Sequence, residues 1–177
     1  MSATRLLILG VLRLLQPAHG YSIRKRLEEW NADEWANVAF GSIYFALNKM
    51  AVEGLVVAVD SDRPESRTGR VPYKLTTLGE QEYHRLLKEE WSHRRPIVDP
   101  FLAGLAFMSS LSRSELLEYL RERRASALRD AETLEANSRF ASPLHVAELS
   151  LLSAARLRAE ADWAEATLAK LERGELP

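Results

Sequence analysis

Residues 41–56 read Gly-Ser-Ile-Tyr-Phe-Ala-Leu-Asn-Lys-Met-Ala-Val-Glu-Gly-Leu-Val, and residues 71–79 read Val-Pro-Tyr-Lys-Leu-Thr-Thr-Leu-Gly. In the first stretch, apolar residues recur at spacings of three and four up to Gly54, which is typical of a helix that stops at a glycine. The β-branched run that follows, an arginine-rich turn and the second stretch predict a two-stranded hairpin with a basic tip. A helix followed by a basic hairpin is the plan of a winged helix-turn-helix, in which the helix enters the major groove of DNA and the hairpin touches the adjacent backbone.

The composition of the chain permits a folded core and excludes several classes of site. Its 177 residues are 46% hydrophobic and carry a formal net charge of −1. The chain has no cysteine, which rules out disulfides, cysteine nucleophiles and thiolate metal sites. The apolar run 6–12 is too short to span a bilayer and lacks the layout of a secretory signal. We therefore expect a soluble cytoplasmic protein without a membrane segment.

Helices precede the hairpin in the first half of the chain. The apolar run 4–16 predicts a central helix, which a turn containing proline and glycine ends. A second helix is expected over residues 21–30, where the apolar residues share one face, and Asn31 ends it. A third helix is expected to begin at Ser42, whose hydroxyl is placed to accept a hydrogen bond from a free backbone N–H group, and to end at Gly54.

The hairpin leads into a fourth helix. Residues 55–59 and 70–75 predict its two strands, and Pro72, which has no backbone N–H to donate, places the second strand at the edge of the sheet. Thr77 and Glu80 have the spacing of a capping box that opens the fourth helix.

The second half of the chain is helical by pattern. Residues 99–110 predict a short apolar helical segment, and Ser112 and Glu115 have the spacing of a second capping box that opens a long helix. The pair 142–143, serine followed by proline, is expected to begin a last helix, which ends at Gly174.

Both long helices carry apolar seams, which need a partner surface. In the last helix the apolar residues alternate spacings of three and four, as in a heptad repeat. A second copy of the chain is the simplest partner, because closed two-fold dimers are the commonest assemblies. The alternative is that the seams close onto the first or fourth helix of the same chain. The residues assigned to the dimer interface are Leu117, Leu120, Leu128, Leu157, Ala161, Ala164, Leu168 and Leu171.

The expected fold is therefore mainly α with a small β-hairpin wing. An N-terminal winged helix-turn-helix domain is expected over residues 1–95. A C-terminal α-helical region, which dimerises and senses an effector, is expected over residues 96–177.

Four short blocks at residues 19–23 (His-Gly-Tyr-Ser-Ile), 41–47, 53–56 and 69–79 place glycines, tyrosines and turn residues in a fixed order. On these blocks the sequence resembles the PadR family of bacterial transcriptional regulators. The tail is similar to the long helical dimerisation region of one branch of that family. A departure is Phe45, at a position where the family commonly has proline.

The third helix is expected to contact DNA. Asn48 has the chemistry to bind the edge of adenine and Lys49 that of guanine. The resemblance implies that Tyr21 and Tyr44 lie near the DNA backbone, although Tyr44 also fits a half-buried core position. The basic wing residues are expected to reach a phosphate or the minor groove, and the alternative is a solvated loop. The residues assigned to DNA are Tyr21, Lys25, Ser42, Tyr44, Asn48, Lys49, Arg63, Arg67, Arg70 and Lys74.

The resemblance also implies a small hydrophobic or aromatic effector, bound in or near the dimer interface. The candidate residues are aromatic or soft and lie near that region in chain order, although such residues are usually ordinary core. Trp91 is the foremost candidate because it precedes the linker between the two expected domains. The candidates are Trp91, Phe101, Phe107, Met108 and Trp163.

An enzymatic function is not expected. The four histidines are scattered, with no metal-ligand spacing, and no glycine-rich phosphate loop or nucleophile elbow is present. We expect no cofactor and no metal. The predicted function is a dimeric DNA-binding regulator, most simply a repressor of a palindromic operator that an effector releases. The alternative is a winged-helix module that binds another protein, because a fold does not dictate a function.

Overall fold

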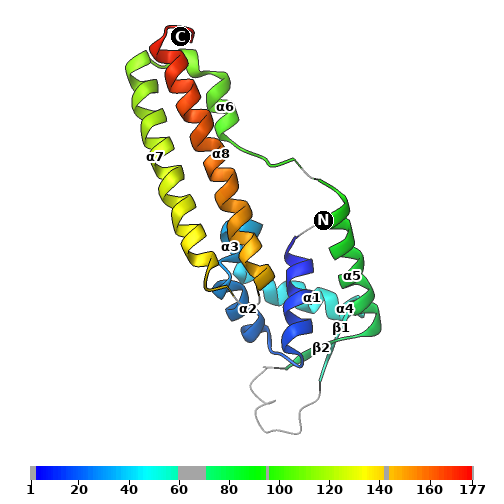
Figure 1. Ribbon diagram of the computed structural model, residues 1–177. Coiled ribbons are helices and arrows are strands. Elements are labelled where there is room, and N and C mark those ends of the chain that lie inside the picture. Colours follow the sequence, from blue (N-terminus) through cyan, green and yellow to red (C-terminus); the bar gives the residue numbers. More distant parts are fainter. Residues whose placement is uncertain (1–2, 60–70, 95, 142–143, 177) are drawn as a thin grey trace. The chain divides into compact units, whose positions relative to one another are not determined.

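The structure is a computed structural model that describes residues 3–59, 71–94, 96–141 and 144–176. The chain forms two compact units, Met1–Pro96 and Ile97–Pro177 (Figure 1). Each unit has its own hydrophobic core. The fold is mainly helical with one small antiparallel sheet, as the sequence predicts.

The N-terminal unit contains the expected helices, hairpin and closing helix, together with one helix that the sequence pattern does not predict. Asn31 adopts a left-handed backbone with φ of 49° and ends the preceding helix, as predicted, but the chain then forms another short helix instead of a loop. Trp35 in that short helix donates its indole N–H to the backbone oxygen of Trp30 at 2.7 Å. In chain order the elements are α1 (Ala3–Leu15), α2 (Gly20–Glu29), α3 (Ala32–Ala36), a 3₁₀ turn (Phe40–Ser42), α4 (Ile43–Val52), β1 (Val56–Ala58), β2 (Tyr73–Leu75) and α5 (Thr77–Ser92).

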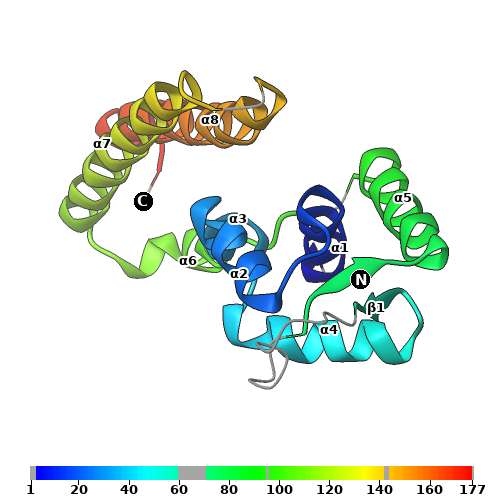
Figure 2. The ribbon, with the colours of Figure 1, turned by 90° about the horizontal axis from the view of Figure 1, so that it is seen from below.

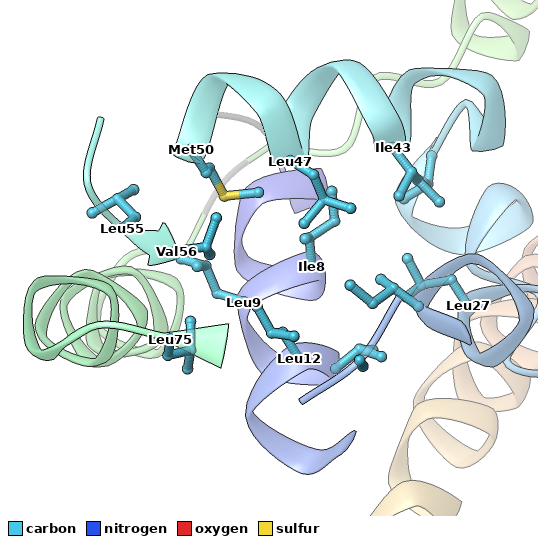
Figure 3. Packing of buried hydrophobic residues seen from close by; sticks show 14 of the residues in the cluster. Ile8, Leu9, Leu12, Leu27, Ile43, Leu47, Met50, Leu55, Val56 and Leu75 are labelled. Atoms are coloured by element: carbon cyan, nitrogen blue, oxygen red, sulfur yellow. The ribbon is translucent and has the colours of Figure 1, made fainter. Parts of the chain in front are cut away.

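Helix α1 is the centre of this unit, as its apolar sequence predicts. Its residues Ile8, Leu9 and Leu12 are fully buried and face α4, α2 and the hairpin (Figure 3). Leu47 and Met50 of α4 pack on the same cluster. The apolar stripe of α4 thus packs against α1, and Asn48 and Lys49 lie on the exposed side of the helix.

The hairpin pairs Val56 with Leu75 and Ala58 with Tyr73 in antiparallel register, and its strands are shorter than predicted. The expectation that the second strand forms an edge is wrong. Ala18, in the turn after α1, pairs with Tyr73 through two backbone hydrogen bonds of 2.9 and 2.8 Å. The side chain of Gln16 accepts a further hydrogen bond from the backbone N–H of Leu75 at 2.8 Å. The turn after α1 therefore covers β2, the strand that Pro72 suggests to be an exposed edge.

Two helix starts differ from the predicted caps. The Ser42 hydroxyl does not cap α4: it donates to the backbone oxygen of Ala39 at 2.7 Å, because the chain enters α4 through a 3₁₀ turn. Helix α5 is capped by Thr76, whose hydroxyl oxygen accepts from the N–H of Gly79 at 3.0 Å. The predicted capping box between Thr77 and Glu80 is therefore not formed, because the helix is capped one residue earlier. With Thr76 as the N-cap, the third helical residue is Gly79, which has no side chain to complete a box. The predicted stop of α4 at Gly54 is confirmed by its φ of +74°.

The C-terminal unit is a pair of long helices with a short helical segment before it. Figure 1 shows α7 and α8 side by side, in antiparallel directions. The predicted capping box at the start of α7 is present in full: Ser112 and Glu115 bond each other's backbone N–H groups. The predicted end of the last helix at Gly174 is also confirmed. The predicted start at residues 142–143 lies outside the described residues. The elements are α6 (Phe101–Ala106), a 3₁₀ turn (Met108–Ser110), α7 (Arg113–Ser138), a second 3₁₀ turn (Leu144–Val146) and α8 (Ala147–Glu172).

The seams of α7 and α8 close largely on each other. This corrects the assignment of Leu120, Ala161, Ala164 and Leu171 to a dimer interface, because their side chains are already buried inside one chain. Four of the assigned residues remain half-buried, with part of their surface open to solvent: Leu117, Leu128, Leu157 and Leu168.

An ion pair that joins α7 to α8 makes stability depend on pH. Arg158 donates two hydrogen bonds to the Glu135 carboxylate, at 2.6 and 2.7 Å, and these bonds lower the pKa of Glu135. The pair therefore stabilises the fold above the ordinary pKa of a glutamate, and this contribution is lost as the pH falls through the lowered pKa. We expect the thermal midpoint of Arg158→Gln to fall less than that of the wild type between about pH 6 and about pH 3. The exposed Arg156→Gln is the control, and an equal fall in all three proteins would contradict the assignment.

Over the described residues, no helix is long and apolar enough to cross a lipid bilayer.

Candidate nucleic-acid interface

Helix α4 has one buried side and one solvent-facing side. Ile43, Leu47 and Met50 point toward α1, whereas Asn48 and Lys49 are exposed (Figure 3). Figure 2 shows α4 lying against α1 with its other side turned away from that helix. The apolar periodicity that predicts the buried stripe therefore also predicts correctly which side chains α4 presents to solvent.

The structure brings together three of the assigned residues that come from different parts of the chain. Tyr21 of α2 and Tyr44 and Asn48 of α4 line one concavity of about 260 Å³. Tyr73 of β2 lines it too and donates its phenolic hydroxyl to the Asn48 side-chain oxygen at 3.4 Å. Tyr73 was missed at the level of sequence, because only the pairing of β2 with the turn after α1 places it beside α4. Tyr44 is 47% exposed and is not among the residues of the hydrophobic core cluster, so part of its ring faces solvent.

Gly20 allows the contact between α2 and α4 that shapes this concavity. A Cβ atom at Gly20 would lie 2.8 Å from Cε1 and 3.0 Å from Cδ1 of the Tyr44 ring. It would also lie 3.1 Å from Cδ1 of the buried Leu47. The closest obstacle is the half-exposed ring of Tyr44, which can rotate away, and no backbone atom is among the three nearest atoms. A residue larger than glycine is therefore expected to displace Tyr44 while leaving the fold intact.

We expect Gly20→Ala to keep a thermal midpoint within a few degrees of the wild type and to weaken operator binding by about tenfold. Ser22→Ala, a change of similar size in the same helix, is the control. Wild-type affinity in Gly20→Ala would show that the position of the Tyr44 ring does not matter for binding.

The remaining residues of α4 form a second concavity on its other flank. Ser42, Phe45 and Lys49 line a space of about 220 Å³ together with Arg5 of α1. Arg5 is held by Glu53 at 2.6 Å. The assigned residues of α4 are thus divided between two flanks of the helix.

The other basic residues near the proposed interface differ in their exposure and in their ion pairs. Lys25 on α2 and Lys74 on β2 are exposed. Within the described part of the chain, Lys25, Lys49 and Lys74 have no carboxylate partner. Arg24 is different: Glu28 accepts its hydrogen bond at 2.6 Å and raises the pKa of Arg24. Arg63, Arg67 and Arg70 lie outside the described residues.

The C-terminal unit contains an apolar cavity of about 200 Å³ between α6, α7 and α8. Phe101 and Trp163 meet edge to face there, with ring centres 5.7 Å apart. The guanidinium carbon of Arg123 lies 3.5 Å from the centre of the Phe101 ring, and Glu160 lies 2.5 Å from its Nε atom. Arg123 was missed at the level of sequence, because only the folding of α6 onto α7 places it beside Phe101.

Two of the candidate effector residues do not line this cavity. Trp91, the foremost candidate, is 85% exposed on α5, and Phe107 is 72% exposed after α6. Phe101, Met108 and Trp163 do line it. Among the described residues, no cluster of histidine and carboxylate side chains could hold a metal ion.

Comparison with protein families places the helices, the hairpin and the surface of α4 in a known context. Residues 8–85, which run from α1 into α5, match the transcriptional regulator PadR-like family. This match covers the N-terminal unit, which is therefore a PadR-like domain. PadR-like proteins are regulators of transcription and not enzymes. No similar sequence was found among curated proteins.

Solved structures of PadR proteins match nearly the whole chain. The crystal structure of Bacillus subtilis PadR in complex with operator DNA matches with a TM-score of 0.72 and 26% identity, over 94% of this chain and 98% of that chain. The same protein in complex with p-coumaric acid matches with a TM-score of 0.70 and 23% identity, over 97% and 98%. The PadR-like regulator BC1756 from Bacillus cereus matches with a TM-score of 0.62 and 19% identity, over 97% and 99%.

Proposed function

We propose that this PadR-like regulator is a cytoplasmic dimeric repressor that binds a palindromic DNA operator through α4 and the wing. The observation that carries the proposal is the surface of α4. Its apolar stripe packs on α1, and its exposed side presents Asn48 and Lys49, which has no carboxylate partner among the described residues. These are side chains that bind base edges in the major groove. Bacillus subtilis PadR, 26% identical over 94% of this chain, crystallised with operator DNA.

The proposed contacts divide into positioning and reading. Tyr21 of α2 and Tyr44 of α4 carry hydroxyls beside one flank of α4, where they suit hydrogen bonds to phosphate oxygens. Ser42 is proposed to reach a phosphate by turning its hydroxyl away from the backbone oxygen of Ala39. Asn48 and Lys49 read base edges between them. The basic residues Lys25 and Lys74, with Arg63, Arg67 and Arg70 of the wing, add contacts to the phosphate backbone.

Dimerisation doubles the number of contacts that the protein makes with DNA. With a net charge of −1, a single chain offers only a small basic patch, and two copies on a palindrome double it. The C-terminal unit exposes several large apolar side chains, and we propose that they meet a second copy together with the half-buried seam residues. The exposed residues are Phe140, Leu144, Leu149, Leu151 and Leu152.

A small aromatic or hydrophobic effector is proposed to bind the cavity at Phe101 and Trp163. The cavity is apolar, and the guanidinium of Arg123, which is paired with Glu160, lies at its wall over the Phe101 ring. p-Coumaric acid, which was crystallised with Bacillus subtilis PadR, combines an aromatic ring with a carboxylate. Trp163→Phe is expected to keep the cavity and to lose most of the change in tryptophan fluorescence that such a ligand causes.

Titration of labelled DNA from directly upstream of the protein's own gene, with an unrelated duplex as the control, tests the DNA-binding function. Tyr44→Phe removes only the hydroxyl and Tyr44→Ala also removes the ring, so the pair separates a phosphate hydrogen bond from packing. We expect selective binding that Tyr44→Ala weakens more than Tyr44→Phe. A winged-helix module that binds protein would bind neither duplex at low salt.

A reporter gene downstream of the bound site tests the sign of regulation. A repressor lowers expression of the reporter, and deletion of the protein raises it. Increased expression in the presence of the protein would make it an activator.

A further inference from the structure

The exposed side of α4 carries an aromatic ring, that of Phe45. Successive residues of an α-helix are turned by about 100°, so Phe45 lies about 200° around the helix from the buried Ile43. It is 75% exposed and takes no part in the hydrophobic core of its unit. Phe40, one turn earlier in the chain, is packed against that core instead.

A single exposed apolar residue is ordinary on a protein surface. Phe45 is notable for its position on α4, between two polar side chains of the exposed side. Asn48 and Lys49 follow one turn later, about 60° to one side of Phe45 and about 40° to the other. The free side of α4 thus has an apolar crest between two groups that form hydrogen bonds. The crest lies in the N-terminal half of the helix, the part with which recognition helices contact bases.

One base pair presents, in the major groove, groups that complement an apolar ring beside an asparagine. Thymine is the base that presents a methyl group there, and phenylalanine is among the side chains that contact it. Asparagine binds adenine with two hydrogen bonds, and adenine pairs with thymine. A ring beside an asparagine therefore fits a stretch of T·A base pairs.

We propose that Phe45 reads the 5-methyl group of a thymine in each operator half-site. This inference rests on the proposed DNA-binding function and assigns the base that the crest of α4 recognises. Because the ring is exposed in the free protein, covering it with a methyl group removes apolar surface from water at no cost to the core.

Deoxyuridine substitution tests the proposal, because it removes the methyl group of thymine and nothing else. A duplex that the wild type selects from a randomised library is resynthesised with deoxyuridine at one symmetric pair of thymines at a time. Burial of one methyl group corresponds to about fourfold in affinity, or about fifteenfold when both half-sites lose it. We expect one pair of positions to show a loss of that size with the wild type.

The variants show whether Phe45 is the reader. Phe45→Ala is expected to weaken binding to the thymine duplex by at least as much and to bind the deoxyuridine duplex equally well. Phe45→Leu is expected to keep part of the discrimination. Val52→Ala removes another exposed apolar side chain from the last turn of the same helix and should discriminate like the wild type. Circular dichroism with thermal melting confirms that each variant is folded.

Four results would overturn the inference. If the wild type selects a duplex and no deoxyuridine position matters, or if Phe45→Ala still discriminates, the assignment of Phe45 is wrong while the DNA-binding function stands. If Phe45→Ala instead dissociates the dimer in sedimentation measurements, the ring contacts protein and not a base. If the wild type selects no sequence at all, the DNA-binding function fails and the inference fails with it.

Discussion

Replacement of Gly79 by alanine is expected to unfold the N-terminal unit at temperatures at which the wild type is stable. A Cβ atom at this position would lie 2.0 Å from the carbonyl oxygen of Leu55 and 3.0 Å from its carbonyl carbon. That carbonyl accepts a hydrogen bond from the backbone N–H of Thr76 at 3.1 Å, so the first turn of α5 and the start of β1 are joined at this point. A backbone carbonyl cannot rotate away as a side chain can. We expect a loss of about 3 kcal/mol or more in the free energy of unfolding, measured by urea denaturation.

Gly104→Ala is the matched control for that experiment. Gly104 lies within α6, and a Cβ atom there would meet nothing within 4 Å. Alanine favours a helix by about 0.5 to 1 kcal/mol over glycine, so this variant should be as stable as the wild type or more so. A denaturation midpoint for Gly79→Ala equal to that of the wild type would show that α5 and β1 do not approach as closely as described.

Reversal of the charge of Lys49 is expected to abolish sequence-specific DNA binding without loss of folding. Lys49 is exposed on the free side of α4, and a glutamate there would place a negative charge in the major groove between two rows of phosphates. A specific base contact corresponds to about 1 to 3 kcal/mol, and a dimer loses it twice. We expect Lys49→Glu to weaken operator binding by at least about a hundredfold in a fluorescence anisotropy titration.

Lys88→Glu changes the net charge of the protein by the same amount on α5. Lys88 is exposed and lies on a helix that takes no part in the proposed interface. Its affinity for the operator should stay within about threefold of the wild type, since a distant exposed charge is screened by salt. Equal losses in the two variants would mean that Lys49 acts through net charge and has no specific contact.

Much of the N-terminal unit could be predicted from local signals. Gly54 ends α4, the β-branched residues after it form β1, and the apolar spacing in α1 predicts the central helix. The errors concern contacts between residues far apart in the chain. Pro72 suggests an edge strand, but Ala18 covers its neighbour Tyr73, and no local pattern reports that pairing.

The candidate site could be predicted in part for the same reason. Periodicity alone separates the buried side of α4 from its exposed side. It does not bring Tyr21 and Tyr44 together: that requires α2 to cross α4 at Gly20, where the absence of a side chain leaves room for the ring.

In the C-terminal unit, the apolar spacing predicts which side of a helix is buried but not which helix covers it. The spacing of Ala161, Ala164 and Leu171 correctly predicts that this side of α8 is buried. It does not say whether the covering helix belongs to the same chain or to a second copy, because both would bury the same apolar surface. In the structure α7 provides the cover.

The salt dependence of binding to the selected duplex tests the central claim most directly. The account predicts that the logarithm of the association constant falls linearly with the logarithm of salt concentration, by about 0.9 for each phosphate contact, with a total slope steeper than about −4 for a dimer. Lys25→Ala is expected to reduce that slope by about 2, one contact in each half-site. A flat slope, or equal affinity for a scrambled duplex at every salt concentration, would contradict the assignment of α4 and the wing to the recognition of operator DNA.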